Sequence, residues 1–192
     1  MTVPATATPP SPSPSPWVQR WAHLIAPGAS VLDLACGRGR NALWLAARGH
    51  AVTGVDRDAA ALESLRGRAE VIVADIEGGP WPLAQRRFGA VVVTHYLWRP
   101  LWPRILDTIE PGGLLIYETF ASGQQALGRP SRSDFLLRHG ELLEVCAGLR
   151  IVAYEDGLEQ RDAAAAPCCI QRIAAVAAPA GDGTPWPHRL GG

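Results

Sequence analysis

Short apolar runs alternate with helix-like segments along most of this chain, and this alternation limits the folds available to it. The first five runs have the length of strands and lie at residues 31–35, 51–56, 70–74, 88–94 and 114–119. Strands of this kind, separated by helices, are typical of a parallel sheet that is covered on both faces. The pattern therefore predicts an α/β architecture.

The end of the chain departs from this alternation. Strands are expected at 150–155 and 168–178, and the link between them leaves little room for a crossover helix, so they should form an antiparallel pair. Asp58 can cap one helix, and the other helices are expected at residues 17–25, 41–48, 103–109 and 133–147. The prediction is a Rossmann-like, doubly wound sheet of seven strands, mostly parallel, with the last strand antiparallel.

The two ends of the chain differ in composition from its middle. Residues 1–16 are rich in Pro, Ser, Thr and Ala and lack the basic start and apolar core of a signal peptide, so we expect a disordered tail. Residues 179–192 are rich in Gly and Pro and are expected to be flexible. Residues 17–178 are enough for one domain with its own core. No apolar run approaches the roughly 20 residues that cross a bilayer, so no membrane partner is expected.

Charge and cysteine content argue against nucleic acid and metal as partners, although a local arginine patch could still bind nucleic acid. The chain has 18 basic and 18 acidic residues, and a neutral chain has no broad electrostatic attraction for nucleic acid. Its four cysteines form no C-x-x-C pair and are not accompanied by His at ligand spacing, so no metal site is predicted. Reduced thiols suit the cytoplasm. We expect a cytoplasmic monomer or homodimer.

The segment 31–39 carries the strongest functional signal, an apolar strand with an embedded Asp33 followed by Gly37-x-Gly39. Glycines suit a tight turn that a ligand approaches closely, and Gly37 to Ala42 also satisfies the G-x-G-x-x-A pattern of dinucleotide-binding proteins. A carboxylate at Asp33 would repel a pyrophosphate. It would attract the ammonium of S-adenosylmethionine (SAM), by about 4 kcal/mol at ~4 Å and a dielectric of ~20 before desolvation costs. The charge favours SAM, with a nucleotide-dependent oxidoreductase as the rival.

Two further carboxylates follow the next strands. Asp56 ends the second strand, where a carboxylate can accept hydrogen bonds from both ribose hydroxyls. Asp75 follows the third strand, where it can accept from the exocyclic amine of adenine. Aspartates at such positions are also helix caps or turn formers, so the prediction depends on the series of Asp33, Asp56 and Asp75.

Residues 31–41 resemble the glycine-rich motif of class I SAM-dependent methyltransferases, and within them the small stand-alone tellurite-resistance enzymes. The resemblance continues through Gly54-Val55-Asp56, Ala74-Asp75-Ile76 and the turn at 111–113. It implies that Asp33, Gly37 and Gly39 surround the methionine part of SAM, that Asp56 holds the ribose, and that Asp75 and Ile76 contact the adenine. It also implies the strand order of that fold. The predicted cofactor-binding set is completed by Ala35, Asn41, Arg57 and Thr94.

The acceptor should lie beyond the carboxyl ends of the strands, beside the cofactor. Residues 94–98 read Thr-His-Tyr-Leu-Trp, unlike the Asn/Asp-Pro-Pro-aromatic motif of enzymes that methylate base or glutamine amines. The catalytic candidates are His95, Tyr96 and Glu118, although His95 could simply pack and Glu118 could pair with an arginine. The long polar loop at 120–132 is a candidate lid.

The sequence thus predicts methyl transfer from SAM to a nucleophilic acceptor, most simply a small molecule. A methyltransferase acting on RNA or protein, or a SAM-binding protein without catalysis, are the alternatives.

Overall fold

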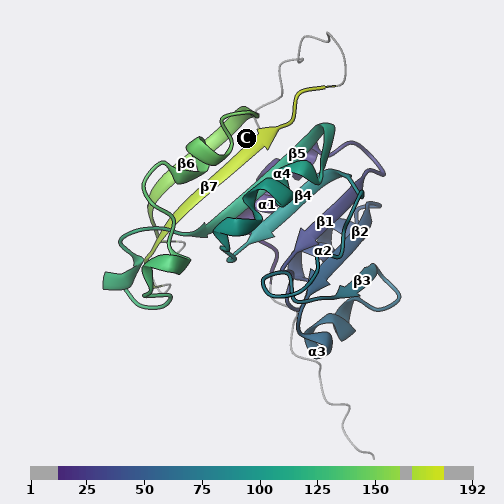
Figure 1. Cartoon of the computed structure of the whole chain (residues 1–192), viewed down its shortest axis with the longest axis horizontal. Helices are drawn as coiled ribbons and strands as arrows, with labels where there is room; N and C mark the ends of the chain where they lie inside the picture. The colour runs from purple at the N-terminus through teal and green to yellow at the C-terminus, as the bar shows by residue number, and fades with distance from the viewer. Residues whose placement is uncertain (1–12, 161–165, 180–192) are drawn as a thin grey trace, which may run out of the picture.

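The computed structural model describes residues 13–160 and 166–179. In this part of the chain one sheet has seven strands in the order β3-β2-β1-β4-β5-β7-β6 (Figure 1). The strands are β1 Ser30–Leu34, β2 Ala51–Asp56, β3 Glu70–Val73, β4 Phe88–Thr94, β5 Ile109–Phe120, β6 Arg150–Glu159 and β7 Cys168–Val176. β1 to β5 are parallel, and β7 is antiparallel to both of its neighbours, β5 and β6. The predicted fold class is confirmed.

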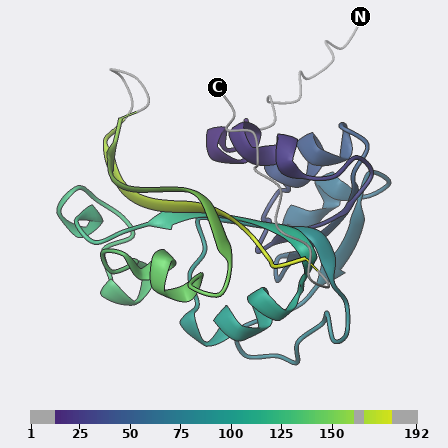
Figure 2. The same ribbon diagram turned by 90° about the horizontal axis from the view of Figure 1, so that it is seen from above.

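Helices cover both faces of the sheet, as Figure 2 shows. α1 and α2 pack on one face with α3, and α4 and α5 pack on the other. The helices are α1 Pro16–Trp21, α2 Arg40–Ala46, α3 Ala59–Leu62, α4 Trp102–Asp107 and α5 Glu141–Val145. Side chains alternate along each strand, so Val31 faces the first layer while Leu32 and Leu34 face the second. The sheet is therefore buried on both sides, which explains its continuous apolar strands.

The first described helix begins before the boundary expected from the sequence. α1 starts at Pro16, and Ser15 caps it by accepting hydrogen bonds from the N–H groups of Trp17 and Val18. Ser15 is fully buried, so the boundary expected at residue 16 lies too far along the chain. The rest of the predicted tail, 1–12, and the predicted flexible end, 180–192, lie outside the described residues.

Of the helix expected at 133–147, only its later part forms an α-helix, α5. The chain instead forms a 3-10 turn at Ser133–Phe135, an extended stretch, and then α5. The extended stretch exists because Leu137 donates its N–H to the carbonyl of Phe120 at 3.0 Å, and Ser122 donates back to the carbonyl of Leu137 at 2.8 Å. Gly140, in the left-handed conformation at φ 73°, then redirects the chain into α5.

Candidate active site

The strand order reverses direction between β1 and β4, and open α/β sheets bind ligands at such a point, outside the carboxyl ends of the strands. A cavity of about 280 Å³ lies there. Its lining comes from the ends of β1 to β4 and the residues that follow them: Ala35, Asp56, Arg57, Ala74, Asp75, Ile76, Glu77, His95 and Tyr96. We call it the first cavity.

The turn after β1 needs both of its glycines for different reasons. Gly39 has φ 68°, and a Cβ there would lie 2.4 Å from Cδ2 of Leu65. Gly37 has φ 54° with no neighbour within 4 Å of an added Cβ, so its conformation alone favours glycine. The N–H of Gly37 donates to Oδ2 of Asp56 at 2.7 Å, which ties the turn to the end of β2.

Asp56 and Asp75 both line the first cavity and are both held by neighbouring backbone. Asp56 accepts from Gly37 and, at 3.0 Å, from the N–H of Asp58. Asp75 accepts from the N–H groups of Glu77 and Gly78 at 3.0 and 3.2 Å, and these bonds hold its pKa below the ordinary value. A carboxylate has about four acceptor sites, so each can still accept from a ligand.

Asp33 lies beneath the cavity and does not line it. Its side chain is 1% exposed, and Oδ2 accepts from the N–H of Ala42 at 2.9 Å, at the start of α2. Oδ1 is buried without a hydrogen-bond partner among the described residues. Desolvation raises the pKa of Asp33 to about 7, against the lowering effect of the bond from Ala42. The expected charge partner of SAM is therefore a weak acid with one unsatisfied oxygen.

Asn41 and Thr94 are brought together away from the cavity. The side-chain amide of Asn41 donates to the Thr94 hydroxyl at 3.0 Å and accepts from the N–H of Ser15 at 2.9 Å. Arg40 donates to the carbonyl of Ser13 at 3.2 Å. The segment 13–15 therefore occupies the polar groups of this corner, and neither Asn41 nor Thr94 lines the cavity.

Glu118 is fully buried and does not line the first cavity, nor a second cavity that adjoins it and is described below. It accepts from the Ser15 hydroxyl at 2.8 Å and from Nη1 of Arg172 at 3.3 Å. Arg172 also bonds Glu155 and Glu159. Of the two roles considered for Glu118, the structure shows the pairing with an arginine.

His95 and Tyr96 do line the cavity. His95 follows the last residue of β4 with φ 56°, as Ala35 follows β1 with φ 53°. Such backbone is costly for residues other than glycine and is concentrated at functional sites. The His95 ring stacks on Phe120 with centroids 5.2 Å apart. Burial raises the pKa of the Tyr96 hydroxyl, so it stays protonated at neutral pH and can donate but not act as a base.

A second cavity, of about 350 Å³, adjoins the first. It shares Glu77, His95 and Tyr96 with the first cavity, and its other lining residues are Leu97, Thr119, Phe120, Pro130 and Phe135. Ala74 lies in the motif Ala74-Asp75-Ile76 but was given no role, and Glu77, the next residue, could have been found by extending that motif. Phe120 is the first residue of the predicted lid, whereas the sequence holds no comparable signal for Phe135.

The loop at 120–132 is fixed to the sheet at its base. Gln124 is 5% exposed, accepts from the N–H of Cys169 at 2.9 Å and donates to the carbonyl of Arg129 at 3.1 Å. The N–H of Ala121 donates to the carbonyl of Cys169 at 2.9 Å. Pro130 brings this loop into the lining of the second cavity.

Neither a metal site nor a membrane span is found in the described ranges. Over 13–160 and 166–179, no cluster of three or more His, Cys, Asp or Glu side chains is placed to hold a metal ion. None of the helices in these ranges is long and apolar enough to cross a membrane.

Comparison with known proteins agrees with this geometry. Residues 31–113 match the family model described as a methyltransferase domain. No curated protein has a sequence that matches the chain. TehB from Haemophilus influenzae has a TM-score of 0.70 at 21% identity, over 83% of this chain and 61% of that one. A TehB-like SAM-dependent methyltransferase from Corynebacterium glutamicum has a TM-score of 0.61 at 19% identity, over 83% and 85% of the two chains.

A third solved structure, 1,6-didemethyltoxoflavin-N1-methyltransferase from Burkholderia thailandensis, has a TM-score of 0.58 at 20% identity, over 84% of this chain and 76% of that one. At these identities the structures show a shared fold. This chain spans less than two thirds of the TehB chain. The family match and the shared fold oppose the oxidoreductase interpretation of the glycine turn. Residues 31–113 are thus similar to a methyltransferase domain, and the chain shares the fold of a SAM-dependent methyltransferase.

Proposed function

We propose that the chain transfers the methyl group of SAM to a small-molecule acceptor, with SAM in the first cavity and the acceptor in the second. The observation that carries the proposal is that the two cavities share Glu77, His95 and Tyr96. A donor and an acceptor on either side of these residues would have their reacting atoms close together. Holding reactants in this way can supply roughly 7–11 kcal/mol of a reaction barrier.

The residues of the first cavity fit SAM. Asp56 suits the ribose hydroxyls, and Asp75 with Ile76 suits the adenine ring and its amine. The glycine turn and the unsatisfied Oδ1 of Asp33 lie at the opposite end of this series, where the amino-acid part of SAM would lie. A buried acceptor without a partner matches a ligand that brings a hydrogen-bond donor.

Bound SAM supplies a methyl group on a sulfonium, which the lone pair of an acceptor can displace without further activation. The chain has to hold the acceptor atom in line and take up any proton that it loses. His95 lines both cavities, and an imidazole titrates near neutral pH, so His95 is the proposed proton acceptor.

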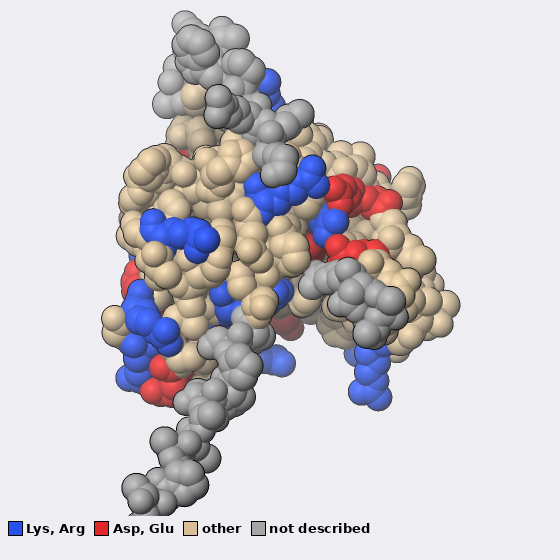
Figure 3. All heavy atoms as spheres, turned by 180° about the vertical axis from the view of Figure 1, so that it is seen from behind, with Lys and Arg blue, Asp and Glu red and all other residues tan. Residues whose placement is uncertain are grey.

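Several observations favour a small molecule over RNA. The chain has no net charge, and on the face in Figure 3 the arginines lie in separate groups among acidic and uncharged side chains. An RNA-binding face would need a continuous basic tract. Two solved structures of the same fold contain small molecules, N-methylheliamine in coclaurine N-methyltransferase and 1,6-didemethyltoxoflavin in the Burkholderia enzyme. We place the activity in the cytoplasm, where free thiols such as those of Cys36 and Cys146 persist.

Labelled methyl transfer from SAM to a cell extract tests the proposal, with the extract separated into small-molecule, protein and RNA fractions. We expect label in the small-molecule fraction. The His95→Ala protein should label this fraction at less than a tenth of the wild-type rate. His95→Asn is the matched control for the backbone, since Asn tolerates the left-handed conformation. Label confined to protein or RNA would contradict the proposed acceptor class. Calorimetric binding of S-adenosylhomocysteine without any transfer would indicate a non-catalytic binding protein.

A further inference from the structure

The second cavity has walls that select against negative charge. Of its lining residues only Glu77 carries a formal charge at neutral pH when His95 is neutral, and that charge is negative. Leu97, Phe120, Pro130 and Phe135 make the rest of the lining largely apolar. An anionic acceptor would meet a carboxylate and lose its hydration without gaining a cation.

Two arginines that contact the segment around Phe135 are already engaged. The guanidinium of Arg132 lies 5.1 Å from the ring centroid of Phe135 and bonds Asp134 at 2.7 Å. Arg99 pairs with Glu141 through two bonds of 2.6 and 2.8 Å. Neither guanidinium lines the cavity, so neither offers an acceptor a free cation there.

Flat rings dominate the part of the wall beside the first cavity. Phe120 and His95 are stacked with an interplanar angle of 23°, and both line the second cavity. Phe135 is 38% exposed although it is a large apolar side chain. An aromatic ligand gains from offset or edge contacts with such rings in addition to the burial of its apolar area.

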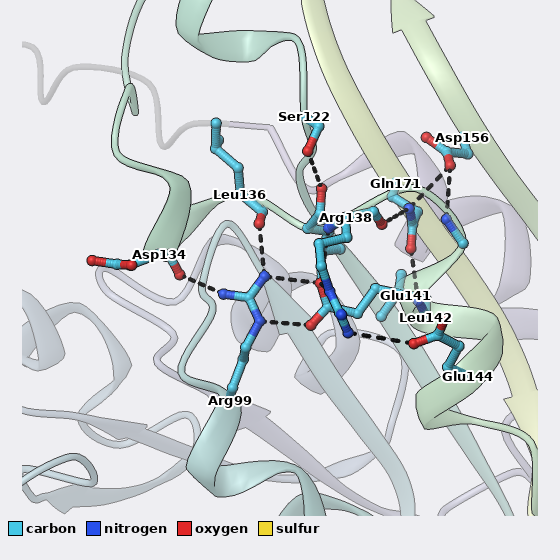
Figure 4. A network of polar contacts seen from close by, with 12 residues as sticks. Arg99, Ser122, Asp134, Leu136, Arg138, Glu141, Leu142, Glu144, Asp156 and Gln171 are labelled. Carbon is cyan, nitrogen blue, oxygen red and sulfur yellow. Dashed lines mark hydrogen bonds and ion pairs between the residues drawn. The ribbon is translucent and has the colours of Figure 1, made fainter.

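Arg99 fixes the backbone on both sides of Phe135, as Figure 4 shows. Its Nη1 donates to the carbonyl of Asp134 at 3.0 Å, and its Nη2 donates to the carbonyl of Leu136 at 2.8 Å. The Glu141 carboxylate that orients this guanidinium is 2% exposed and also accepts from the N–H of Arg138 at 2.8 Å. A planar guanidinium with five donors can make all of these bonds at once, which a lysine cannot.

We infer that the second cavity takes a flat, aromatic acceptor without negative charge, that Phe135 determines this specificity, and that Arg99 is the residue that positions Phe135. The inference rests on the proposed function and names the acceptor class of the same site. It predicts discrimination against small oxyanions, because these carry the charge that the lining rejects and lack the ring that it contacts.

Binding of neutral and charged probes to the protein saturated with S-adenosylhomocysteine tests the acceptor class. We expect 1-naphthol to bind at least tenfold more tightly than 1-naphthoate, which has the same ring system and a negative charge, and selenite to bind more weakly than either. Tighter binding of naphthoate or selenite would overturn the inference. If S-adenosylhomocysteine itself fails to bind, the proposed function fails instead, so the two failures are distinguishable.

Variants test the two named residues. Phe135→Ala should weaken 1-naphthol at least tenfold, and Phe135→Leu should weaken it less, while the affinity for S-adenosylhomocysteine stays within twofold for both. Arg99→Lys should weaken naphthol binding as Phe135→Ala does, with an unchanged cofactor affinity. The lysine keeps the positive charge but loses the planar guanidinium that donates to two carbonyl groups at once. Unchanged naphthol affinity in Phe135→Ala would refute the role of Phe135, and in a folded Arg99→Lys it would refute the role of Arg99. Phe135 is partly exposed, so its variants remain informative even if Arg99→Lys does not fold.

Discussion

The two cavities are built from contacts of very different range in the sequence. In the first cavity Asp75 accepts from N–H groups two and three positions further on, and Asp56 accepts from Asp58 and, across 19 positions, from Gly37. Around the second cavity Arg99 contacts Glu141 across 42 positions. A contact between residues close in the sequence needs only the end of one strand and the turn after it. A contact between distant residues exists only when the whole sheet has assembled. The cofactor side therefore depends on contacts that span fewer positions than those of the acceptor side, which need the completed fold.

Asp33 gives the largest effect expected on the cofactor side. Its folded pKa of about 7 exceeds the value of 3.8 in an unfolded chain, so between these values only the folded state keeps the proton. The free energy of unfolding should then fall as pH rises from about 4 to about 7 and level off above. The slope should reach about 1.4 kcal/mol per pH unit, with a total on the order of 4 kcal/mol.

Urea unfolding of the wild type and of Asp33→Asn across this pH range measures the effect. The asparagine can still accept from Ala42 but does not ionise, so the difference between the two proteins should grow with pH. Parallel curves would mean that the Asp33 carboxyl ionises normally in the folded state.

Glu118 tests how much contacts between residues distant in the sequence stabilise the fold. Glu118→Ala should lower the free energy of unfolding by about 3 kcal/mol, because the Ser15 hydroxyl and Arg172 lose a buried partner. Glu118→Gln keeps an acceptor for Ser15 and should cost about half as much while retaining turnover. A stable Glu118→Gln protein without turnover would restore Glu118 as a catalytic candidate.

Asp56 tests whether a locally held carboxylate binds the cofactor. Asp56→Ala should weaken S-adenosylhomocysteine about 100-fold, close to 2.7 kcal/mol, because it removes the ribose acceptor and the tie to Gly37. Asp58→Ala is the control, since Asp58 only caps α3 and its loss should cost about 1 kcal/mol of stability. Equal affinities of both variants in calorimetry would remove Asp56 from the site.

Gly39 gives the smallest effect. Gly39→Ala should cost about 2 kcal/mol of stability, because the left-handed backbone is strained and Leu65 must move. Gly49→Ala has a comparable φ of 87° but open space around it, so about 1 kcal/mol is expected in thermal unfolding. The difference between the two isolates the contact with Leu65, and equal losses would show that this contact adds nothing.

The same division by range explains what the sequence could and could not predict. Asp56, Asp75 and Ile76 line the first cavity, as their positions at or just after the ends of recognisable strands indicated, and their contact with a cofactor stays a prediction. Asn41 was predicted to bind the cofactor, but it does not line the cavity and instead bonds Thr94 and Ser15, a residue that was assigned to a disordered tail. Composition alone could not show that a Ser-Pro pair would cap a helix and become buried.

Most of the residues around the second cavity could not be predicted from the sequence. The helical spacing at 133–147 competes with the hydrogen bonds between Leu137 and Phe120, which depend on β5 being in place, and the hydrogen bonds prevail. Phe135 and Arg99 acquire their roles only through that rearrangement. The predicted lid at 120–132 supplies two wall residues, Phe120 and Pro130, and its movement during turnover stays a prediction.

The position of α1 has a consequence for the order in which the protein can be made. Ser15 bonds Glu118, and the indole N–H of Trp17 donates to the carbonyl of Ile173 at 3.2 Å. α1 is synthesised before the strands of the sheet, so its partner residues exist only once β7 has also been synthesised. Until then Trp17 and Trp21 have no complete surface to pack on, so an interrupted chain should expose two indole rings and attract chaperones.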